Sequence, residues 1–252
     1  MIRKAIGFPV LVALAAILIS CGGSGAENGT TAQKQTLSLG LGNSPIFRVG
    51  PGKDSTGTQV YSFTYVQAAV VFNADGKIAD LEVDELEVST PNYDGLSMPH
   101  FSGWPGSPEP NITNHDTEKV EGKAPTTEDS IIAEVTAWKT KRDRGDSYGM
   151  SDTNDWWKQM DAWEALFIGK TIDEVETFYA KYTNDRNGRP LNPETTDPAE
   201  KAKYERMSKG DREVVADVRS GATMSINDAH GYVLKAIREA WDKRKPMPEL
   251  NI

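Results

Sequence analysis

Residues 61–65 alternate between aromatic and hydroxyl side chains, with the period of two that is typical of a β-strand buried on one face. The aromatic positions of the first run are Tyr61, Phe63 and Tyr65. The run continues to Phe72, and the sequence NADGK then supplies turn-forming residues, with Gly76 directly after Asp75. This pattern predicts a β-hairpin.

In the return strand of this hairpin, the apolar residues change from one face of the strand to the other. Leu81 and Val83 share one face, but the next apolar pair, Leu86 and Val88, would point to the other face. Because a side-chain period of two cannot absorb such a change, the sequence predicts a β-bulge near Asp84.

Apolar residues recur at helical spacing in four later stretches. Their stripes are Ile131, Ile132, Val135 and Trp138; Trp156, Met160, Trp163 and Phe167; Ile172, Val175, Phe178, Tyr179 and Tyr182; and Ala229, Val233, Ala236, Ile237, Ala240 and Trp241. The second stretch ends at Gly169, and the third begins with the capping box Thr171 and Glu174. The fourth is predicted to run from about Asp228 to Arg244, with Asp228 as its N-cap.

The segment 89–123, between the hairpin and the helices, is dense in Pro, Gly and Asn and shows no period. A segment of this length is either a functional loop or a disordered insert, and its aromatic residues Tyr93, Phe101 and Trp104 favour the functional loop. Strands followed by helices predict an α+β fold: a twisted antiparallel sheet with an N-terminal hairpin, a mostly helical insertion and a C-terminal helix packed on the sheet.

The N-terminus has the features of an export signal. Two basic residues precede an uncharged apolar run, residues 5–19, that is shorter than the roughly 20 residues a membrane span needs. The signal, residues 1–20, ends in LIS before Cys21, which resembles a bacterial lipobox in which this only cysteine becomes the acylated first residue of the mature protein. The alternative is an ordinary signal peptide with Cys21 near its end by chance. Residues 21–36, rich in Gly, Ser and Thr, predict a flexible tether.

The charge and the potential metal ligands narrow the range of partners. A net charge of −9 argues against nucleic acid and leaves the lipid as the expected membrane contact. The three histidines are His100, His115 and His230. They share no ligand spacing, and the one cysteine is assigned to the lipid, so no metal site is predicted.

The sequence TNDRNGRPLNPE resembles an EF-hand calcium loop only in part. Asp185 and Glu194 fall at ligand positions, but Pro190 and Pro193 obstruct the loop geometry. We interpret the segment as a polar turn, with a calcium site as the alternative.

The segment DVRSGATMS, residues 217–225, fits the pattern Asp, two variable residues, Ser or Thr, Gly, Ala, Ser or Thr, one variable residue, Ser or Thr. Average residue usage would produce this pattern by chance in a chain of this length with a probability on the order of 10⁻⁴. The segment resembles the flavinylation motif of the FMN-binding domain family, which includes subunits of the sodium-pumping NADH:quinone oxidoreductase and Rnf complexes and many exported lipoproteins.

The resemblance implies that a flavin transferase links FMN through its phosphate to Thr223. The other motif residues are Asp217, Ser220, Gly221, Ala222 and Ser225. The sequence EVSTPN is similar to a Glu-Thr-Pro-Gly segment that lies by the flavin in the family, which adds Thr90 and Pro91 as expected contacts. Ser89 and Asn92 depart from that pattern.

The residue types of the motif are compatible with this chemistry. Gly221 and Ala222 allow a close approach of the backbone to a phosphate. A helix that began near Asp228 would direct its positive N-terminal end toward the phosphoester. The aromatic loop from Tyr93 to Trp104 is expected either to fold over the flavin ring or to pack on the helical insertion.

We therefore expect residues 37–252 to form a single FMN-binding domain with an insertion at about 97–212. Its expected function is that of a lipid-anchored, extracytoplasmic electron carrier rather than a stand-alone enzyme, reduced by a membrane quinol or NADH oxidase. The alternatives are a lipoprotein that binds flavin or another small ligand non-covalently, and a structural or adhesion lipoprotein.

Overall fold

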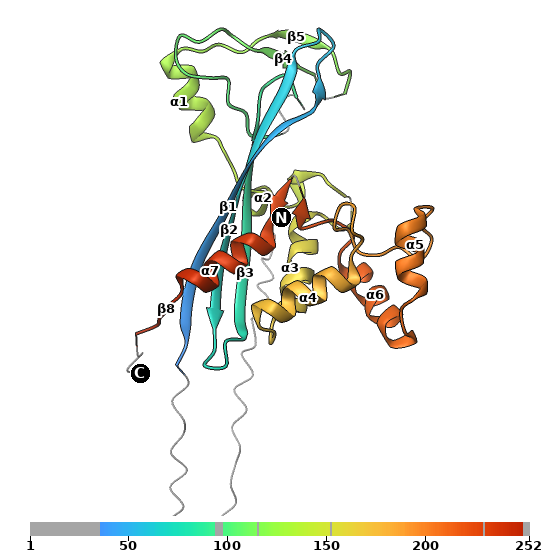
Figure 1. Ribbon diagram of the computed structural model, residues 1–252. Helices are drawn as coiled ribbons and strands as arrows, with labels where there is room; N and C mark the ends of the chain where they lie inside the picture. The colour runs from blue at the N-terminus through green and yellow to red at the C-terminus, as the bar shows by residue number, and fades with distance from the viewer. Residues whose placement is uncertain (1–35, 94–97, 115, 152, 229, 249–252) are drawn as a thin grey trace, which may run out of the picture. The chain divides into compact units, whose positions relative to one another are not determined.

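The computed structural model describes residues 36–93, 98–114, 116–151, 153–228 and 230–248 (Figure 1). The expected export signal, Cys21 and nearly all of the expected tether lie outside the described residues, as do His115 and Ala229. Within the described part of the chain, no helix has both the length and the apolar character that crossing a bilayer requires.

The main sheet is antiparallel and has the strand order β3-β2-β1-β8 (Figure 1). Its strands are β1 (Ser38–Lys53), β2 (Gln59–Phe72), β3 (Ile78–Ser89) and β8 (Lys245–Pro246). Two small two-stranded sheets pair β4 (Asn111–Thr113) with β5 (Val120–Lys123) and β6 (Asn227–Asp228) with β7 (Gly231–Tyr232). The predicted hairpin is confirmed as β2 and β3, and its turn has Gly76 at a φ of 75°.

The helices lie between β5 and β8 in the chain. They are α1 (Glu128–Thr136), α2 (Lys141–Arg144), the 3₁₀ helix η1 (Gly145–Tyr148), α3 (Trp156–Phe167), α4 (Ile172–Tyr182), α5 (Pro198–Glu205), α6 (Lys209–Gly221) and α7 (Val233–Lys243). The capping box of Thr171 and Glu174 is confirmed at the start of α4. With these helices packed on the sheet, the predicted α+β fold class is confirmed.

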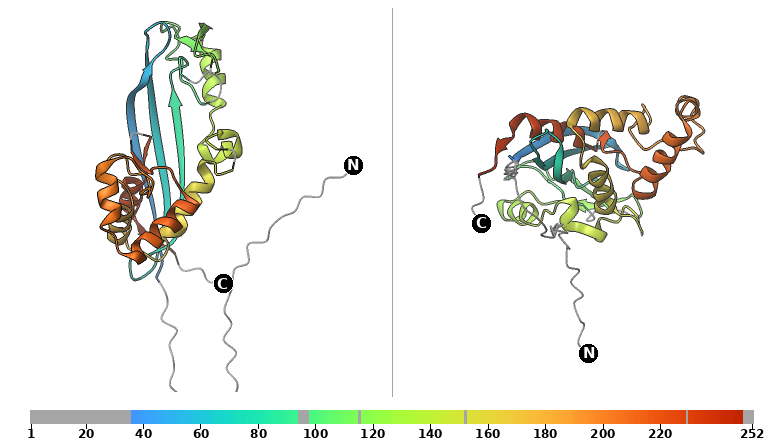
Figure 2. Two further views of the ribbon diagram at one scale, coloured as in Figure 1. Left: turned by 90° about the vertical axis from the view of Figure 1, so that its right-hand side faces the viewer. Right: turned by 90° about the horizontal axis from the view of Figure 1, so that it is seen from below.

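One face of the sheet forms the main hydrophobic core with α3, α4 and α7 (Figure 2). The central strand contributes Val66, Ala68, Val70 and Phe72, all of which are buried. On β1, the same face presents Gly40 and Gly42, and α7 lies directly against them: a Cβ on either glycine would collide with the backbone of Ala240 or Ala236. The small residues on both elements therefore allow this helix to approach the sheet closely.

The predicted bulge near Asp84 is wrong. Asp84 pairs regularly with Gln67, and the register shift of this hairpin lies between Val71 and Phe72 instead. The parity of the apolar residues changes because Glu85 continues the core-facing side of β3 as a buried charged residue. The apolar residues that follow it belong to the opposite face of the sheet.

The last helix starts later than predicted. It begins at Val233, with Tyr232 as an N-cap whose side chain makes no capping hydrogen bond. Asp228 is therefore not an N-cap; it lies in β6, and its carboxylate accepts a hydrogen bond from the backbone N–H of His230 at 2.8 Å. The short β6-β7 hairpin occupies the residues that were expected to form the first helical turn.

The described part of the aromatic loop, residues 98–104, packs against Trp138 and so takes the second of its two expected positions. The ring of Phe101 lies 5.4 Å from that of Trp104 and 6.3 Å from that of Trp138, which follows α1. The indole N–H of Trp138 donates to the carbonyl oxygen of His100 at 2.7 Å. These contacts place the loop with α1, β4 and β5 at the opposite end of the sheet from α4 to α6 (Figures 1 and 2).

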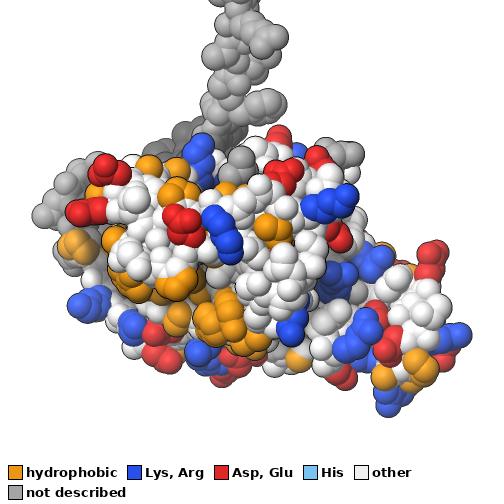
Figure 3. All heavy atoms as spheres, turned by 90° about the horizontal axis from the view of Figure 1, so that it is seen from above, with side chains coloured by type: hydrophobic (Ala, Val, Ile, Leu, Met, Phe, Trp, Pro, Cys, Tyr) orange, Lys and Arg blue, Asp and Glu red, His pale blue; other side chains and the backbone are white. Residues whose placement is uncertain are grey.

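Acidic and basic side chains are interspersed on the face drawn in Figure 3. The net negative charge of the chain therefore produces no field of a single sign on that face.

Candidate functional site

The 217–225 motif spans the end of α6 and the turn that follows it. Asp217 and Ser220 lie on the last turns of the helix with exposed side chains, and the Ser220 hydroxyl donates to the carbonyl oxygen of Asp217 at 2.7 Å. Ala222, the C-cap, is fully buried, whereas the next residue, Thr223, is exposed. The hydroxyl that the resemblance marks for modification is therefore accessible from solvent.

Gln159 of α3 holds the backbone of the motif in place. Its buried side-chain oxygen accepts the N–H groups of Thr223 at 2.8 Å and of Met224 at 2.9 Å. The Thr223 hydroxyl makes only a 3.4 Å contact with the same oxygen. The backbone of Thr223 is thus fixed, while its hydroxyl is nearly unengaged.

Replacing Gln159 with leucine is expected to lower the free energy of unfolding by about 1–3 kcal/mol, because two backbone N–H groups lose their acceptor. Urea unfolding followed by tryptophan fluorescence would measure the loss. Gln67→Leu, the same exchange at an exposed position of β2, is the control and should change stability by less than about 0.5 kcal/mol. Equal effects of the two exchanges would contradict the role given to Gln159.

The glycine of the motif serves helix packing. A Cβ on Gly221 would lie 2.7 Å from the Cβ of Ala162, so α6 and α3 are in close contact at this position. The Asn154 amide donates to the Gly221 carbonyl oxygen at 3.1 Å and satisfies one group at the helix end. The close approach that was expected to admit a phosphate here admits a neighbouring helix.

The expected support from a helix dipole is absent at this position. Thr223 follows the C-terminal end of α6, which carries the negative end of the helix dipole, and α7 begins only at Val233. Any phosphate at Thr223 would therefore be held by its covalent bond and by side chains rather than by the N-terminus of α7.

A cavity of about 190 Å³ lies beside the motif and is lined in part by Met224, Ser225 and Ile226. The remaining apolar part of its wall comes from Tyr148, Met150, Trp156, Met160 and Val233, and its polar part from Glu85, Lys141, Arg189, Asp228, His230 and the backbone of Gly231. We call it the Met224 cavity. Its wall combines aromatic and thioether side chains, which suit a flat ring, with a polar part of similar extent.

Three of the polar lining residues, Glu85, Lys141 and His230, form a charged cluster with Glu87, in which His230 is the exposed member. The Lys141 ammonium, from the first residue of α2, lies 2.5 Å from Glu85 Oε1 and 3.0 Å from Glu87 Oε2. The side chains of Glu85 and Lys141 are only 3% and 4% exposed. Two buried carboxylates therefore share one buried ammonium.

Burial raises the pKa of Glu85 to about 7, against the opposing attraction of Lys141. Burial also disfavours the ionised form of Glu87, but Lys141 and His230 outweigh it and lower the pKa of this carboxyl to about 2. Burial likewise opposes the charged form of Lys141, yet the two carboxylates raise its pKa well above the ordinary value. The pKa values of the two glutamates thus move in opposite directions, although the residues lie only two positions apart on one strand.

His230 forms the outer end of this cluster. Its Nδ1 lies 3.6 Å from Glu87 Oε1, and its side chain is 52% exposed. Arg48 of β1 approaches the same imidazole at 3.2 Å. The neighbouring Gly231 covers Glu85 so closely that a Cβ there would lie 2.8 Å from Glu85 Oε2. The β6-β7 hairpin therefore connects the motif directly to the buried carboxyl groups.

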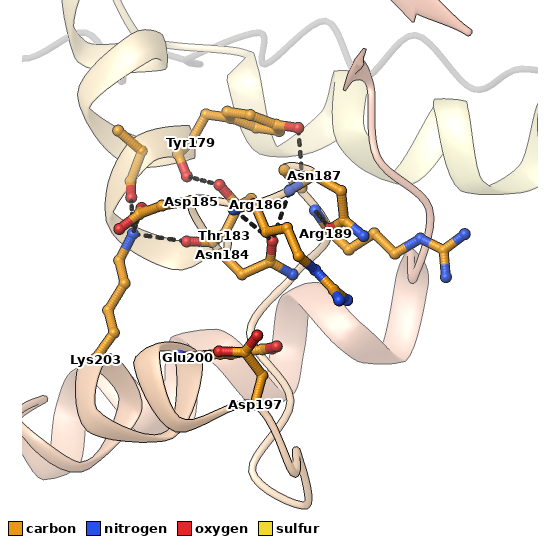
Figure 4. Close-up of polar contacts among 12 residues, drawn as sticks. Tyr179, Thr183, Asn184, Asp185, Arg186, Asn187, Arg189, Asp197, Glu200 and Lys203 are labelled. Atoms are coloured by element: carbon orange, nitrogen blue, oxygen red, sulfur yellow. Dashed lines mark hydrogen bonds and ion pairs between the residues drawn. The ribbon is translucent and has the colours of Figure 1, made fainter. Parts of the chain in front are cut away.

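An open hollow of about 800 Å³ adjoins the Met224 cavity and shares three lining residues with it: Arg189, Asp228 and His230. Its opposite wall is the loop of the expected EF-hand-like segment. Figure 4 shows Asp185 of this loop directed at the ammonium of Lys203, 2.5 Å away, whereas Arg186 extends away from the loop. Among the described residues, no three or more His, Cys, Asp or Glu side chains form a group that could hold a metal ion.

The structure does not bring Thr90 and Pro91 to the motif. The Thr90 hydroxyl donates to Asn92 Oδ1 at 2.6 Å and accepts the N–H of Tyr61 at 3.1 Å. The buried amide of Asn92 donates in turn to the carboxylate of Asp54 at 3.2 Å. Desolvation would raise the pKa of Asp54, but several hydrogen bonds outweigh it and lower this pKa. Thr90 and its neighbours therefore stabilise the chain turns at the far end of β2 and β3, and none of them lines the Met224 cavity.

Among known proteins, the sequence is 33% identical over 184 residues to a chlorophenol reductase from Desulfitobacterium hafniense, an alignment that covers 70% of this chain and 50% of that protein. The chain thus spans about half the length of the curated relative it matches. No family model and no solved structure matches it. The similarity relates this chain to a redox protein.

Proposed function

Starting from this relation to a reductase, we propose that the protein is an extracytoplasmic, membrane-tethered electron carrier with FMN attached covalently to Thr223. The observation that carries the proposal is the position of the 217–225 motif. Its threonine hydroxyl is exposed to a modifying enzyme on a fixed backbone, and its next residues line a cavity with an aromatic wall.

The side chains of the Met224 cavity fit a flavin ring in character. Trp156, Met160 and Met224 offer flat or adaptable apolar surfaces to such a ring. At about 190 Å³ the cavity admits only part of the ring, and the adjoining 800 Å³ hollow would receive the remainder of the cofactor. When bound, FMN would supply the capacity to accept and pass on electrons.

The reductase relative supports a redox role. In this proposal, residues 37–252 form the flavin domain, residues 97–212 its insertion, and Cys21 carries the lipid. A flavin transferase would attach the FMN, and a membrane quinol or NADH oxidase would reduce it. A lipid anchor and a flexible tether would raise the concentration of the carrier near such a membrane donor.

The intact mass of the mature protein, co-produced with a flavin transferase and denatured before analysis, tests the proposal. The expected mass exceeds that of the bare chain by one FMN unit, and Thr223→Ala should lose that unit completely because it removes the hydroxyl that is esterified. Thr153→Ala, at another exposed threonine, is the matched control and should keep the FMN.

A bare chain, obtained with a transferase that modifies a known substrate, would overturn the covalent attachment. Yellow colour that is then lost on dialysis under denaturing conditions would indicate reversible flavin binding in the same cavity. A protein without any chromophore would favour a structural or adhesion role.

A further inference from the structure

We propose that the edge of the main sheet at β8 is a membrane-docking surface, which contacts a bilayer of anionic phospholipid while the lipid on Cys21 anchors the chain. The inference rests on the proposed function for that lipid anchor, but not for the flavin. It adds a second membrane contact to the expected one, and this contact would determine which side of the tethered domain faces the bilayer.

The surface is an open hollow of about 670 Å³ where the start of β1 meets β8 (Figure 1). Two leucines of β1 lie in it with much of their side chains in water: Leu41 is 66% exposed and Leu39 is 40% exposed. Exposed apolar residues that gather in this way mark a contact site. We call the hollow the β8 surface and define it by its lining residues, Leu39, Leu41, Lys243, Lys245, Pro246, Met247 and Pro248.

Basic side chains border the apolar residues of the β8 surface. Residues 243–245, Lys-Arg-Lys, are the only three consecutive basic residues in an otherwise acidic sequence. Glu239 partly neutralises Lys243, since its Oε1 lies 2.8 Å from the ammonium, whereas Lys245 is exposed. This combination suits an anionic bilayer, because leucine side chains can enter the boundary of the acyl chains while lysine ammonium groups remain among the phosphates.

The net negative charge of the chain does not oppose this contact. Salt screens charges over about 10 Å, so carboxylates elsewhere on the domain act only weakly on headgroups at this edge. Asp80 and Glu82 share the outer face of the sheet with the two leucines, but they lie on β3, two strand spacings or about 10 Å from β1. The bilayer would therefore contact the β1-β8 edge rather than the whole face.

The predicted tether enters the domain at the same surface. The carbonyl oxygen of Leu37 accepts the N–H of Met247 at 2.9 Å, so the first described residues are bonded directly to the lining of the β8 surface. Residues 22–36 separate Cys21 from Leu37, and a flexible chain of this length spans roughly 20 Å on average. A lipid on Cys21 would hold this edge of the domain near the bilayer, at an effective concentration that makes a weak contact sufficient.

A second copy of the chain is a less suitable occupant of the β8 surface. A twofold contact places the same patch of both copies together, so the two Lys-Arg-Lys runs would face each other. Like charges brought together in this way disfavour association. Anionic headgroups complement the same residues.

Vesicle co-sedimentation of the mature chain with Cys21→Ser, which cannot carry the lipid, tests the β8 surface without the anchor. We expect this chain to bind vesicles of equal parts phosphatidylglycerol and phosphatidylcholine, and to bind vesicles of phosphatidylcholine alone more weakly. In this background, Leu41→Ser should weaken binding about 10-fold, because it removes an apolar side chain that enters the bilayer. Lys245→Gln should weaken it about 5-fold, because it removes one charge at the headgroups.

The far end of β1 offers matched controls. Val49→Ser removes an apolar side chain that is 67% exposed, and Lys53→Gln removes an exposed lysine. Val49 lies about 26 Å along the strand from Leu41, so both control variants should bind as the Cys21→Ser chain does. All four positions are exposed, so the variants are expected to keep the fold, which circular dichroism would verify.

A polarity-sensitive dye on a single introduced cysteine measures which side of the domain meets the vesicle. In the Cys21→Ser background, the emission of the dye on Pro248→Cys should shift to the blue when anionic vesicles are added. The emission of the same dye on Val49→Cys should stay unchanged, because that position points away from the proposed contact.

Several results would overturn the docking surface: no binding to anionic vesicles, equal weakening by Leu41→Ser and Val49→Ser, or the same shift of both dyes. A lipid-free dimer that Leu41→Ser dissociates would also overturn it, because a second copy would then be the occupant. The anchor is tested separately. An unmodified Cys21 in the mass spectrum of the mature protein removes the lipid of the proposed function, whereas a lipidated protein whose Cys21→Ser form ignores vesicles removes the docking surface alone.

Discussion

Replacing Lys141 with methionine is expected to lower the free energy of unfolding at pH 7 by about 3–5 kcal/mol, because it leaves two buried carboxyl groups without their cation. Methionine keeps most of the side-chain volume, so the loss reports on charge rather than on a cavity. Lys139→Met, at an exposed position close by in the chain, should cost less than about 0.5 kcal/mol. Urea unfolding followed by tryptophan fluorescence would compare the two.

The loss of unfolding free energy in Lys141→Met should be larger at pH 7 than at pH 4. In the unaltered protein, the lowered pKa of Glu87 contributes stability above its unfolded pKa of about 4.5, and this contribution is lost as the pH falls toward 2. The raised pKa of Glu85 has the opposite effect, since it lowers stability as the pH rises from about 4.5 to 7. Without Lys141 both carboxyl groups would be protonated in the folded state at higher pH, so the deficit of the variant should shrink as the pH falls from 7 to 4. A deficit independent of pH would contradict this account.

Gly42→Val is expected to cost about 3 kcal/mol or more, because the new side chain would meet the backbone of α7 rather than a flexible side chain. The helix can escape this collision only by moving away from the sheet, which would expose part of the main core. Gly52→Ala, in the same strand but with open space around its Cβ, is the control. Thermal unfolding would show a large decrease in Tm for the first variant and little change for the second.

The collision at Gly42 also predicts a graded series. Gly42→Ala should fall between the unaltered protein and the valine variant, because its Cβ already meets the backbone at Ala236. If alanine is tolerated without loss, the helix has room to move, and its close approach is not a requirement of the fold.

The sequence pattern predicts the parts of the fold in which local preferences and tertiary packing agree. The β2-β3 hairpin, the stripe of α3 and the capped start of α4 are examples. The pattern does not predict β1, because its core-facing positions include Gly40 and Gly42, while Leu39 and Leu41 point outward. Its burial pattern follows from the approach of α7, which periodicity within the strand does not reveal.

The bulge prediction failed for a related reason. It assumed that the buried face of β3 remains apolar, whereas Glu85 and Glu87 continue that face with Lys141 as their partner. A lysine in the polar sequence TKRDRG has the appearance of a surface residue. Only the packing of α2 on the sheet makes it the counter-ion of two strand residues.

For the candidate site, the sequence motif points to Thr223 through a pattern of small and hydroxyl residues. This assignment stays a prediction, with which the exposed position of Thr223 is compatible. The cavity beside it could not be predicted, because Trp156, Met160 and Glu85 come from separate elements that meet only in the folded chain. The parity change between Val83 and Leu86 was the one sequence signal of the buried carboxyl groups, and it was interpreted as a backbone irregularity.

The long β1 strand has a consequence for solubility. Its outer edge pairs with β8 only at Ser38 and Leu39, so no described strand covers the edge farther along, where Phe47 and Val49 are exposed. Such an edge can recruit a strand from another molecule and start aggregation. Pro45 lies within this strand and has no N–H to offer, which interrupts the row of donors that an incoming strand would need. The proline thus acts as a safeguard against edge-to-edge association, at a position where the hydrogen bonds of the sheet itself do not require a donor.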